Sequence, residues 1–150
     1  MDVFVFAQGV KEAAKSKLIE DGKHDPLILC LMPKEVCVLP ILMKDEQEKL
    51  RTLEKLKKLI KLFNVWAYVV ITEGRMLSLK TDDLLIKPSE SPDSVKILMV
   101  SAISYKRRVA WYIPINKDDG KISFGKETSL DTEKGFTVTG LFMDLLPEIN

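Results

Sequence analysis

The feature that most constrains the fold is an uncharged run in the middle of the chain, residues 66–72 (Trp-Ala-Tyr-Val-Val-Ile-Thr). A run of aromatic and β-branched residues without charge is typical of a strand that is covered on both faces and lies inside a sheet. A second run, Val95–Ser104, predicts another buried strand. The chain is therefore expected to fold around a sheet.

A hairpin is predicted nearer the N-terminus. Two apolar segments, residues 26–32 and 36–42, flank the turn-forming residues 33–35. Short apolar runs separated by a turn are typical of paired antiparallel strands. Pro40 has no amide hydrogen to donate, which predicts that the second strand is an edge strand or ends nearby.

The hairpin also predicts how the two cysteines lie. A turn centred between Pro33 and Lys34 places Cys30 directly opposite Cys37, because paired residues lie equally far from the turn. Opposed β-carbons on neighbouring strands are close to the separation that a disulfide needs. We expect two buried, reduced thiols, with a cross-strand disulfide and a metal or redox role as the alternatives.

Two segments have helical periodicity, Val3–Asp21 and residues 45–64. Gly22 is expected to end the first helix, because glycine adopts a left-handed conformation at little cost. Asp45 with Glu48 is expected to cap the start of the second helix. The apolar positions that predict the buried faces are Phe6, Val10, Ala13, Ala14 and Leu18 in the first helix, and Leu50, Leu53, Leu56, Ile60 and Phe63 in the second.

The C-terminal third is predicted to continue the sheet. Residues 107–115 and Lys121–Phe124 read as two strands joined by a tight turn at Asp119 and Gly120. Residues 125–135 are predicted to be a loop. Residues 136–146 are ambiguous between strand and helix, and we favour a strand to residue 139 followed by one helical turn.

These elements, with a short strand at residues 76–79, predict a single α+β domain over residues 1–150. The order α-β-β-α-β-β-β-β, rich in hairpins, predicts a mainly antiparallel sheet. The two helices are expected to pack side by side on one face of that sheet, which would give two layers.

Composition narrows the function. Lys and Arg total 23 against 22 for Asp and Glu, a net charge of +1, which argues against a dedicated nucleic-acid binder. The sequence has no export signal and no apolar stretch long enough to span a membrane, so a cytoplasmic location is expected. Many lysines and few amide side chains suggest a thermophilic source.

One basic stretch could still bind nucleic acid. Lys106, Arg107 and Arg108 lie close to Tyr105 and Trp111, and basic and aromatic residues together can bind single strands. Strand alternation, however, predicts that Trp111 faces the core. A structural role for this stretch is therefore preferred.

The acids after the central strand are the candidate catalytic and metal-binding residues. Glu73 follows the apolar run, and a long polar loop behind it carries Glu90 and Asp93, together with Asp82 and Asp83. Carboxylates at a strand end can hold Mg²⁺ or transfer protons. The only histidine, His24, is expected to lie in a solvated connector.

Part of the chain resembles a group of small uncharacterised microbial proteins. The residues that carry the resemblance are residues 69–76 (Val-Val-Ile-Thr-Glu-Gly-Arg-Met), residues 88–94 (Pro-Ser-Glu-Ser-Pro-Asp-Ser) and the strand at residues 97–101. The group carries no activity that transfers to this chain. The resemblance implies that Glu73, Glu90 and Asp93 belong to one constellation.

The sequence favours a protein-interaction or structural domain, acting as a homodimer or with another protein partner. The preference rests on edge strands, on a surplus of apolar residues and on the lack of a catalytic signature. The alternative is a metal-dependent hydrolase or nuclease that uses the acids around Glu73, with Mg²⁺ as its cofactor. Outside that alternative no cofactor is predicted, and whether the chain is an enzyme is left open.

Overall fold

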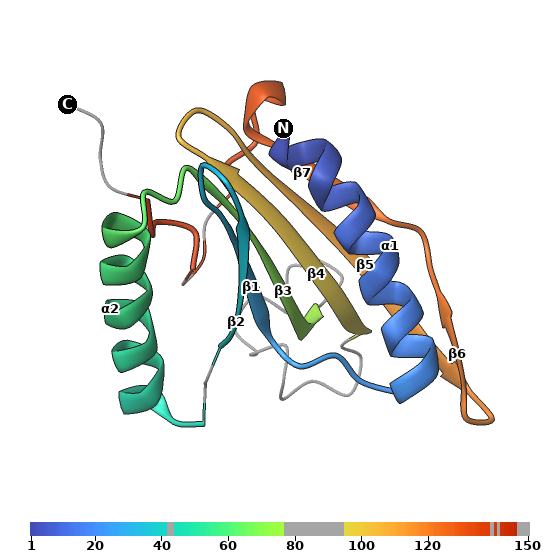
Figure 1. Cartoon of the computed structure of the whole chain (residues 1–150). Coiled ribbons are helices and arrows are strands. Elements are labelled where there is room, and N and C mark those ends of the chain that lie inside the picture. Colours follow the sequence, from blue (N-terminus) through green and yellow to red (C-terminus); the bar gives the residue numbers. More distant parts are fainter. Residues whose placement is uncertain (42–43, 77–94, 139, 141, 147–150) are drawn as a thin grey trace, which may run out of the picture.

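Figure 1 shows the computed structural model, which describes residues 1–41, 44–76, 95–138, 140 and 142–146. Helices and strands follow one another along this part of the chain. They are α1 (Val3–Asp21), β1 (Leu27–Leu31), β2 (Val36–Pro40), α2 (Glu46–Leu62), β3 (Ala67–Met76), β4 (Val95–Ser104), β5 (Arg108–Asp118), β6 (Lys121–Phe124) and β7 (Thr128–Asp131), followed by a 3₁₀ turn at Thr132–Lys134.

All these strands pair antiparallel in one seven-stranded sheet. The order across it is β2-β1-β3-β4-β5-β6, and β7 pairs with the other end of β5. The uncharged run of the sequence forms most of β3, which lies between β1 and β4. The predicted α+β class is confirmed, and the order of helices and strands is broadly as predicted.

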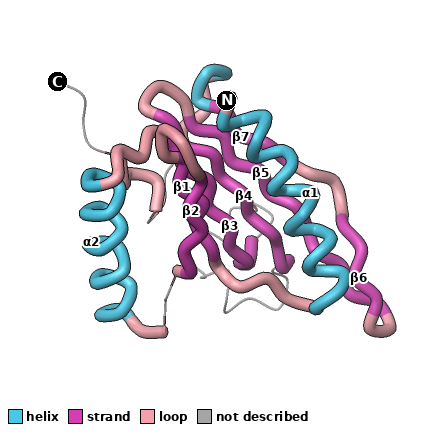
Figure 2. Tube along the Cα trace, viewed as in Figure 1, coloured by secondary structure: helices cyan, strands magenta, loops and turns pink. Residues whose placement is uncertain are grey.

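The two helices cover opposite faces of the sheet (Figures 1 and 2). Ala67, Val69 and Ile71 of β3 belong to the hydrophobic cluster of α1, whereas the alternate residues Tyr68 and Val70 belong to that of α2. The prediction that both helices pack on one face is therefore wrong. A strand without charged side chains has two apolar faces, and each of them needs a cover.

Helix α1 begins and ends as predicted. The Asp2 carboxylate accepts a hydrogen bond from the Phe4 amide (2.8 Å), and Gly22, with φ of 77°, follows the last turn. The buried face was predicted less well. Lys11 is buried on it, whereas Ala13 is exposed.

Helix α2 begins with the predicted cap, since Asp45 accepts a hydrogen bond from the Glu48 amide at 2.8 Å. Only its middle is buried. Leu56 and Ile60 lie in the core, whereas Leu50 near the start is 59% exposed. An exposed Phe63 follows the last turn, so the predicted apolar stripe is correct in its centre and wrong at both ends.

The hairpin of β1 and β2 has the predicted register, with Cys30 opposite Cys37. The second predicted tight turn is also present, between β5 and β6. Asp119 and Gly120 have φ values of 50° and 78°, as a type I′ turn requires.

The region after β6 differs from the prediction. Thr128–Asp131, predicted to be loop, forms strand β7 beside β5. The described residues between 136 and 146, called the C-terminal segment below, form neither strand nor helix. Val138, Phe142 and Leu145 of this segment are buried in the cluster of α2, so the segment completes the cover of that face. The predicted strand at residues 76–79 lies outside the described residues, except that Met76 ends β3.

Candidate functional site

The most distinctive surface of the described chain is the outer edge of β2, which we call the β2 edge (residues 36–40). Ile41 donates its amide hydrogen to the Pro26 carbonyl (3.0 Å) and Met32 donates to the Glu35 carbonyl (2.9 Å). Main-chain groups alternate in direction along a strand of an antiparallel pair. The N–H and C=O groups of Val36 and Val38 therefore point away from β1, where no strand of the described residues pairs with them.

Pro40 fits this alternation. Its missing N–H would also point outward, so the proline removes no hydrogen bond from the β1–β2 pair. The prediction that Pro40 belongs to an edge strand is confirmed.

The β2 edge carries no charged side chain, and Pro40 is its one feature of the kind that commonly protects an edge strand. Its exposed side chains are Val36, Val38 and Pro40, and Val38 is 54% exposed. Proteins commonly guard such edges with charged side chains, because free backbone groups and apolar residues invite another strand.

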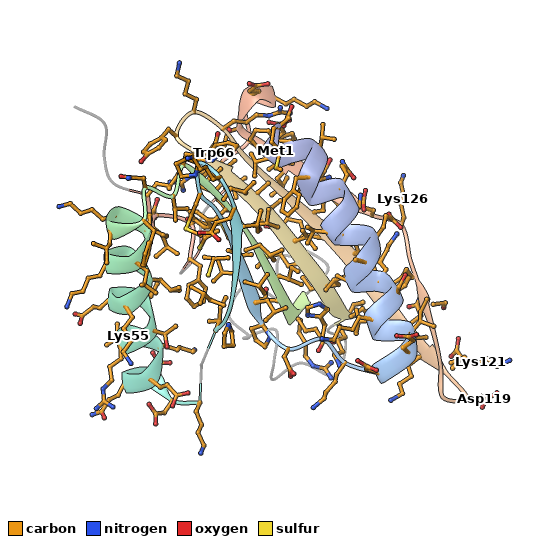
Figure 3. All side chains as sticks on the ribbon, in the orientation of Figure 1. Met1, Lys55, Trp66, Asp119, Lys121 and Lys126 are labelled. Carbon is orange, nitrogen blue, oxygen red and sulfur yellow. The ribbon has the colours of Figure 1, made fainter. Side chains whose placement is uncertain are left out.

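The opposite side of the sheet carries charged and polar side chains instead. Lys121 and Ser123 are the exposed residues of β6, and Thr128 and Ser129 are exposed on β7. Figure 3 shows Lys121 and Lys126 on this side, with their side chains directed away from the sheet. The uncharged edge is therefore a local feature of β2.

An apolar groove adjoins the β2 edge. A cavity of about 310 Å³ lies between β2 and the end of α2. Cys37 and Leu39 line it from β2, Leu59 and Phe63 line it from α2 and the residue that follows, and Glu35 is the one charged residue of its lining. Phe63 is 51% exposed and its neighbour Leu62 is 72% exposed, so the apolar surface continues beyond the cavity.

Both cysteines line this groove, and both are free thiols. Cys30 is buried as predicted, whereas Cys37 is only partly buried. Burial, together with the neighbouring Cys37, raises the pKa of Cys30 to about 11. A thiol with a raised pKa is a poor nucleophile at neutral pH, because the thiolate is the reactive form. Cys30 therefore has the properties of a core residue rather than of a catalytic nucleophile.

Glu73, the first of the predicted catalytic acids, is a half-buried residue of β3 with two partners. Its Oε2 accepts a hydrogen bond from the His24 amide (3.2 Å), and its Oε1 lies 3.3 Å from Lys96 Nζ in an ion pair. The His24 side chain is buried, so the prediction of a solvated connector is wrong. Glu73 fixes the connection between α1 and β1 to the central strand.

The role of Glu73 can be measured by two substitutions. Glu73→Ala should lower the free energy of unfolding by about 1–3 kcal/mol, because it leaves the buried His24 amide without its acceptor. Glu73→Gln keeps an acceptor oxygen and should cost clearly less. Urea denaturation of both variants tests this; equal losses would show that the ion pair with Lys96, and not the hydrogen bond, carries the effect.

The other predicted acids, Glu90 and Asp93 with Asp82 and Asp83, lie outside the described residues. Among the described residues, no group of three or more His, Cys, Asp and Glu side chains is arranged to hold a metal ion. Glu73 is the one predicted acid that lies among the described residues, and its contacts give no support to the hydrolase or nuclease hypothesis.

The basic stretch before β5 is engaged within the fold. Arg107 forms two hydrogen bonds with the Asp131 carboxylate (3.1 and 2.6 Å) and lies over the Phe4 ring. This pairing lowers the pKa of Asp131. Arg108 forms an ion pair with Asp144 at 2.5 Å, and Trp111 is buried as predicted. The two arginines therefore hold β5 to α1, β7 and the C-terminal segment.

Sequence reasoning found the β2 strand and its edge proline but not the importance of its valines. The signal was present in the alternation of Val36, Val38 and Pro40, which puts three uncharged residues on one face of an edge strand.

Comparison of the chain with protein-family models, with curated proteins and with solved structures found no significant match. No helix in the described ranges is long and apolar enough to cross a membrane. The function must therefore be inferred from the site itself.

Proposed function

We propose that this chain is a protein-interaction domain that acts as a homodimer, with the β2 edge as its contact surface. The observation that carries the proposal is the direction of the backbone groups at Val36 and Val38, which no described strand pairs, beside exposed and uncharged side chains. Adding a strand at such an edge is a common mode of protein recognition, in which main-chain hydrogen bonds supply affinity.

A second copy of the chain fits this edge better than a charged or polar partner. A twofold axis brings an identical surface against itself, so the contact must be self-complementary. The exposed residues of the β2 edge are all apolar and would meet apolar residues of the same kind. No like charges of β2 would be brought together, because β2 has no charged residue.

The groove beside β2 supports the same contact. Alternate side chains of a strand added along β2 would point toward the cavity that Leu59 and Phe63 line. Burial of Phe63 and of the two exposed valines would add hydrophobic stabilisation to the hydrogen bonds of the backbone.

The substitution Val38→Lys tests the proposal. It should weaken dimerisation about 100-fold or more, because it places two like charges close together in an uncharged contact, which costs several kcal/mol. The Val38 side chain is exposed in the single chain, so the fold itself should survive. Sedimentation equilibrium over a range of protein concentrations measures the dissociation constant.

Ser123→Lys is the matched control. It adds the same charge at an exposed position of the opposite edge strand, β6, and should leave the dissociation constant unchanged. A wild-type chain that stays monomeric at high concentration, or equal weakening by both substitutions, would contradict the proposal.

A further inference from the structure

We infer that the two β2 strands of the dimer pair in a single register, which places Cys37 directly opposite the partner's Cys37. This inference rests on the proposed function, since it requires that a second copy occupies the β2 edge. To the proposed dimer it adds the position of the twofold axis and the pairing of two thiols, one from each chain.

The direction of the backbone groups limits the registers that can form. In an antiparallel pair, residues whose groups point outward from one strand must meet residues whose groups point outward from the other. On β2 these residues are Val36, Val38 and Pro40, as the hydrogen bonds of Ile41 and Met32 show.

An axis at Val36 would pair each Val38 with the partner's Lys34, which lies in the bend before β2 and outside the strand. Pro40 distinguishes between the remaining registers. With the axis at Cys37, each Val36 pairs with the partner's Val38, and both residues exchange N–H and C=O bonds. With the axis at Val38, each Val36 meets the partner's Pro40, which has no N–H to donate. That arrangement leaves two Val36 carbonyls without a donor, whereas an axis at Cys37 leaves no group of Val36 or Val38 unpaired.

The side chains agree with an axis at Cys37. Val36 and the partner's Val38 would be cross-strand neighbours on one face, and pairs of β-branched residues stabilise such contacts. On the other face the two Cys37 side chains would meet, next to the groove that Cys37 already lines.

The two Cys37 residues would be close enough to form a disulfide. They would occupy a non-hydrogen-bonded pair, in which the α-carbons lie about 4.5 Å apart. Disulfides span α-carbon separations of roughly 4.4–6.8 Å. Because Cys30 faces Cys37 within each chain, the dimer would carry a row of four thiols across its centre.

Cys30 is the competing partner of Cys37 and is the weaker one. The two residues form a hydrogen-bonded pair, in which the side chains lie farther apart than in a non-hydrogen-bonded pair such as the two Cys37 residues would form. Cys30 is also buried, and its raised pKa leaves little thiolate at neutral pH. Mild oxidation of the dimer should therefore join Cys37 to the partner's Cys37.

Oxidation with diamide tests this geometry. The S–S bond forms as two S–H bonds break, and diamide takes up the two protons and two electrons to become the hydrazine. Intact-mass measurement under non-reducing conditions should show a covalent dimer of the wild type that is two hydrogens lighter than two chains. Cys30→Ala should give the same product, since it removes only the competing thiol.

Two variants make the result decisive. Val38→Lys retains Cys37 but should not dimerise, so it should form much less covalent dimer than the wild type. The amount that remains measures disulfides formed by random collision of two chains. In the double variant Cys37→Ala with Val38→Cys, the new thiol would meet its partner only with the axis at position 38, so no covalent dimer is expected.

The outcomes separate the inference from the proposed function. If sedimentation shows a dimer that Val38→Lys disrupts, the proposed function holds whatever the oxidation shows. A covalent dimer of the double variant, or none with Cys30→Ala, would then overturn the register. A chain that sediments as a monomer would overturn both.

Discussion

Tyr68→Ala is expected to lower the free energy of unfolding by about 3–5 kcal/mol, the range for removing a large buried aromatic side chain. Tyr68 is fully buried at the centre of the sheet, on the face that α2 covers. Its hydroxyl donates to the Phe142 carbonyl at 2.6 Å and accepts from the Leu145 amide at 3.3 Å. The residue therefore joins the central strand to the C-terminal segment.

Tyr68→Phe separates these two contributions. It keeps the ring and leaves the Phe142 carbonyl and the Leu145 amide without a partner, which should cost about 1–3 kcal/mol. Burial raises the pKa of Tyr68, so the hydroxyl stays protonated and able to donate throughout the neutral and mildly alkaline range.

Denaturant unfolding of both Tyr68 variants measures these losses, and Tyr105→Phe is the control. Tyr105 is 43% exposed, and removal of its hydroxyl should change the stability by no more than about 0.5 kcal/mol. If Tyr68→Phe were as mild as Tyr105→Phe, the C-terminal segment would not depend on the buried hydroxyl for its position.

Local patterns of the sequence were sufficient to predict most elements of the sheet. The bounds of α1, β4 and β6 agree with the prediction, and the turn at Asp119 and Gly120 is where the sequence places it. These elements depend on caps, turn residues and short-range alternation, all of which act within a few residues of each other.

The arrangement of the helices was not predictable in the same way. Residues 66–72 indicated a strand covered on both faces, yet both helices were assigned to one face. Nothing local distinguishes the two sides of an apolar strand, so the choice depends on how the chain crosses the sheet. The C-terminal segment was missed for a related reason, because it has no regular structure and is ordered by contacts with Tyr68 and Arg108.

The candidate site also has one feature that the sequence predicts locally and others that depend on the whole fold. The register of Cys30 and Cys37 follows from counting along a hairpin, and the structure confirms it. Which strands lie at the edges depends on the order of all the strands, and that order joins β1 to β3 across the whole of α2. Glu73 appeared catalytic in the sequence because its partner, the amide of His24, lies 49 positions away.

Leu56→Ala is expected to lower the free energy of unfolding by about 2–5 kcal/mol, because it removes buried atoms and leaves a cavity. Leu56 is only 3% exposed and belongs to the same cluster as Tyr68. Leu50→Ala makes the same chemical change on the same helix at a position that is 59% exposed. It should alter the stability by no more than about 0.5 kcal/mol.

This pair of variants measures what the apolar periodicity of α2 could not show. Leu50, Leu53 and Leu56 are equivalent in the helical pattern, but only the middle of the helix lies against the sheet, and Leu53 is only partly buried. Leu53→Ala should therefore fall between the other two substitutions when all three are compared by urea denaturation. Equal losses at Leu50 and Leu56 would mean that the start of α2 packs against the sheet as closely as its middle does.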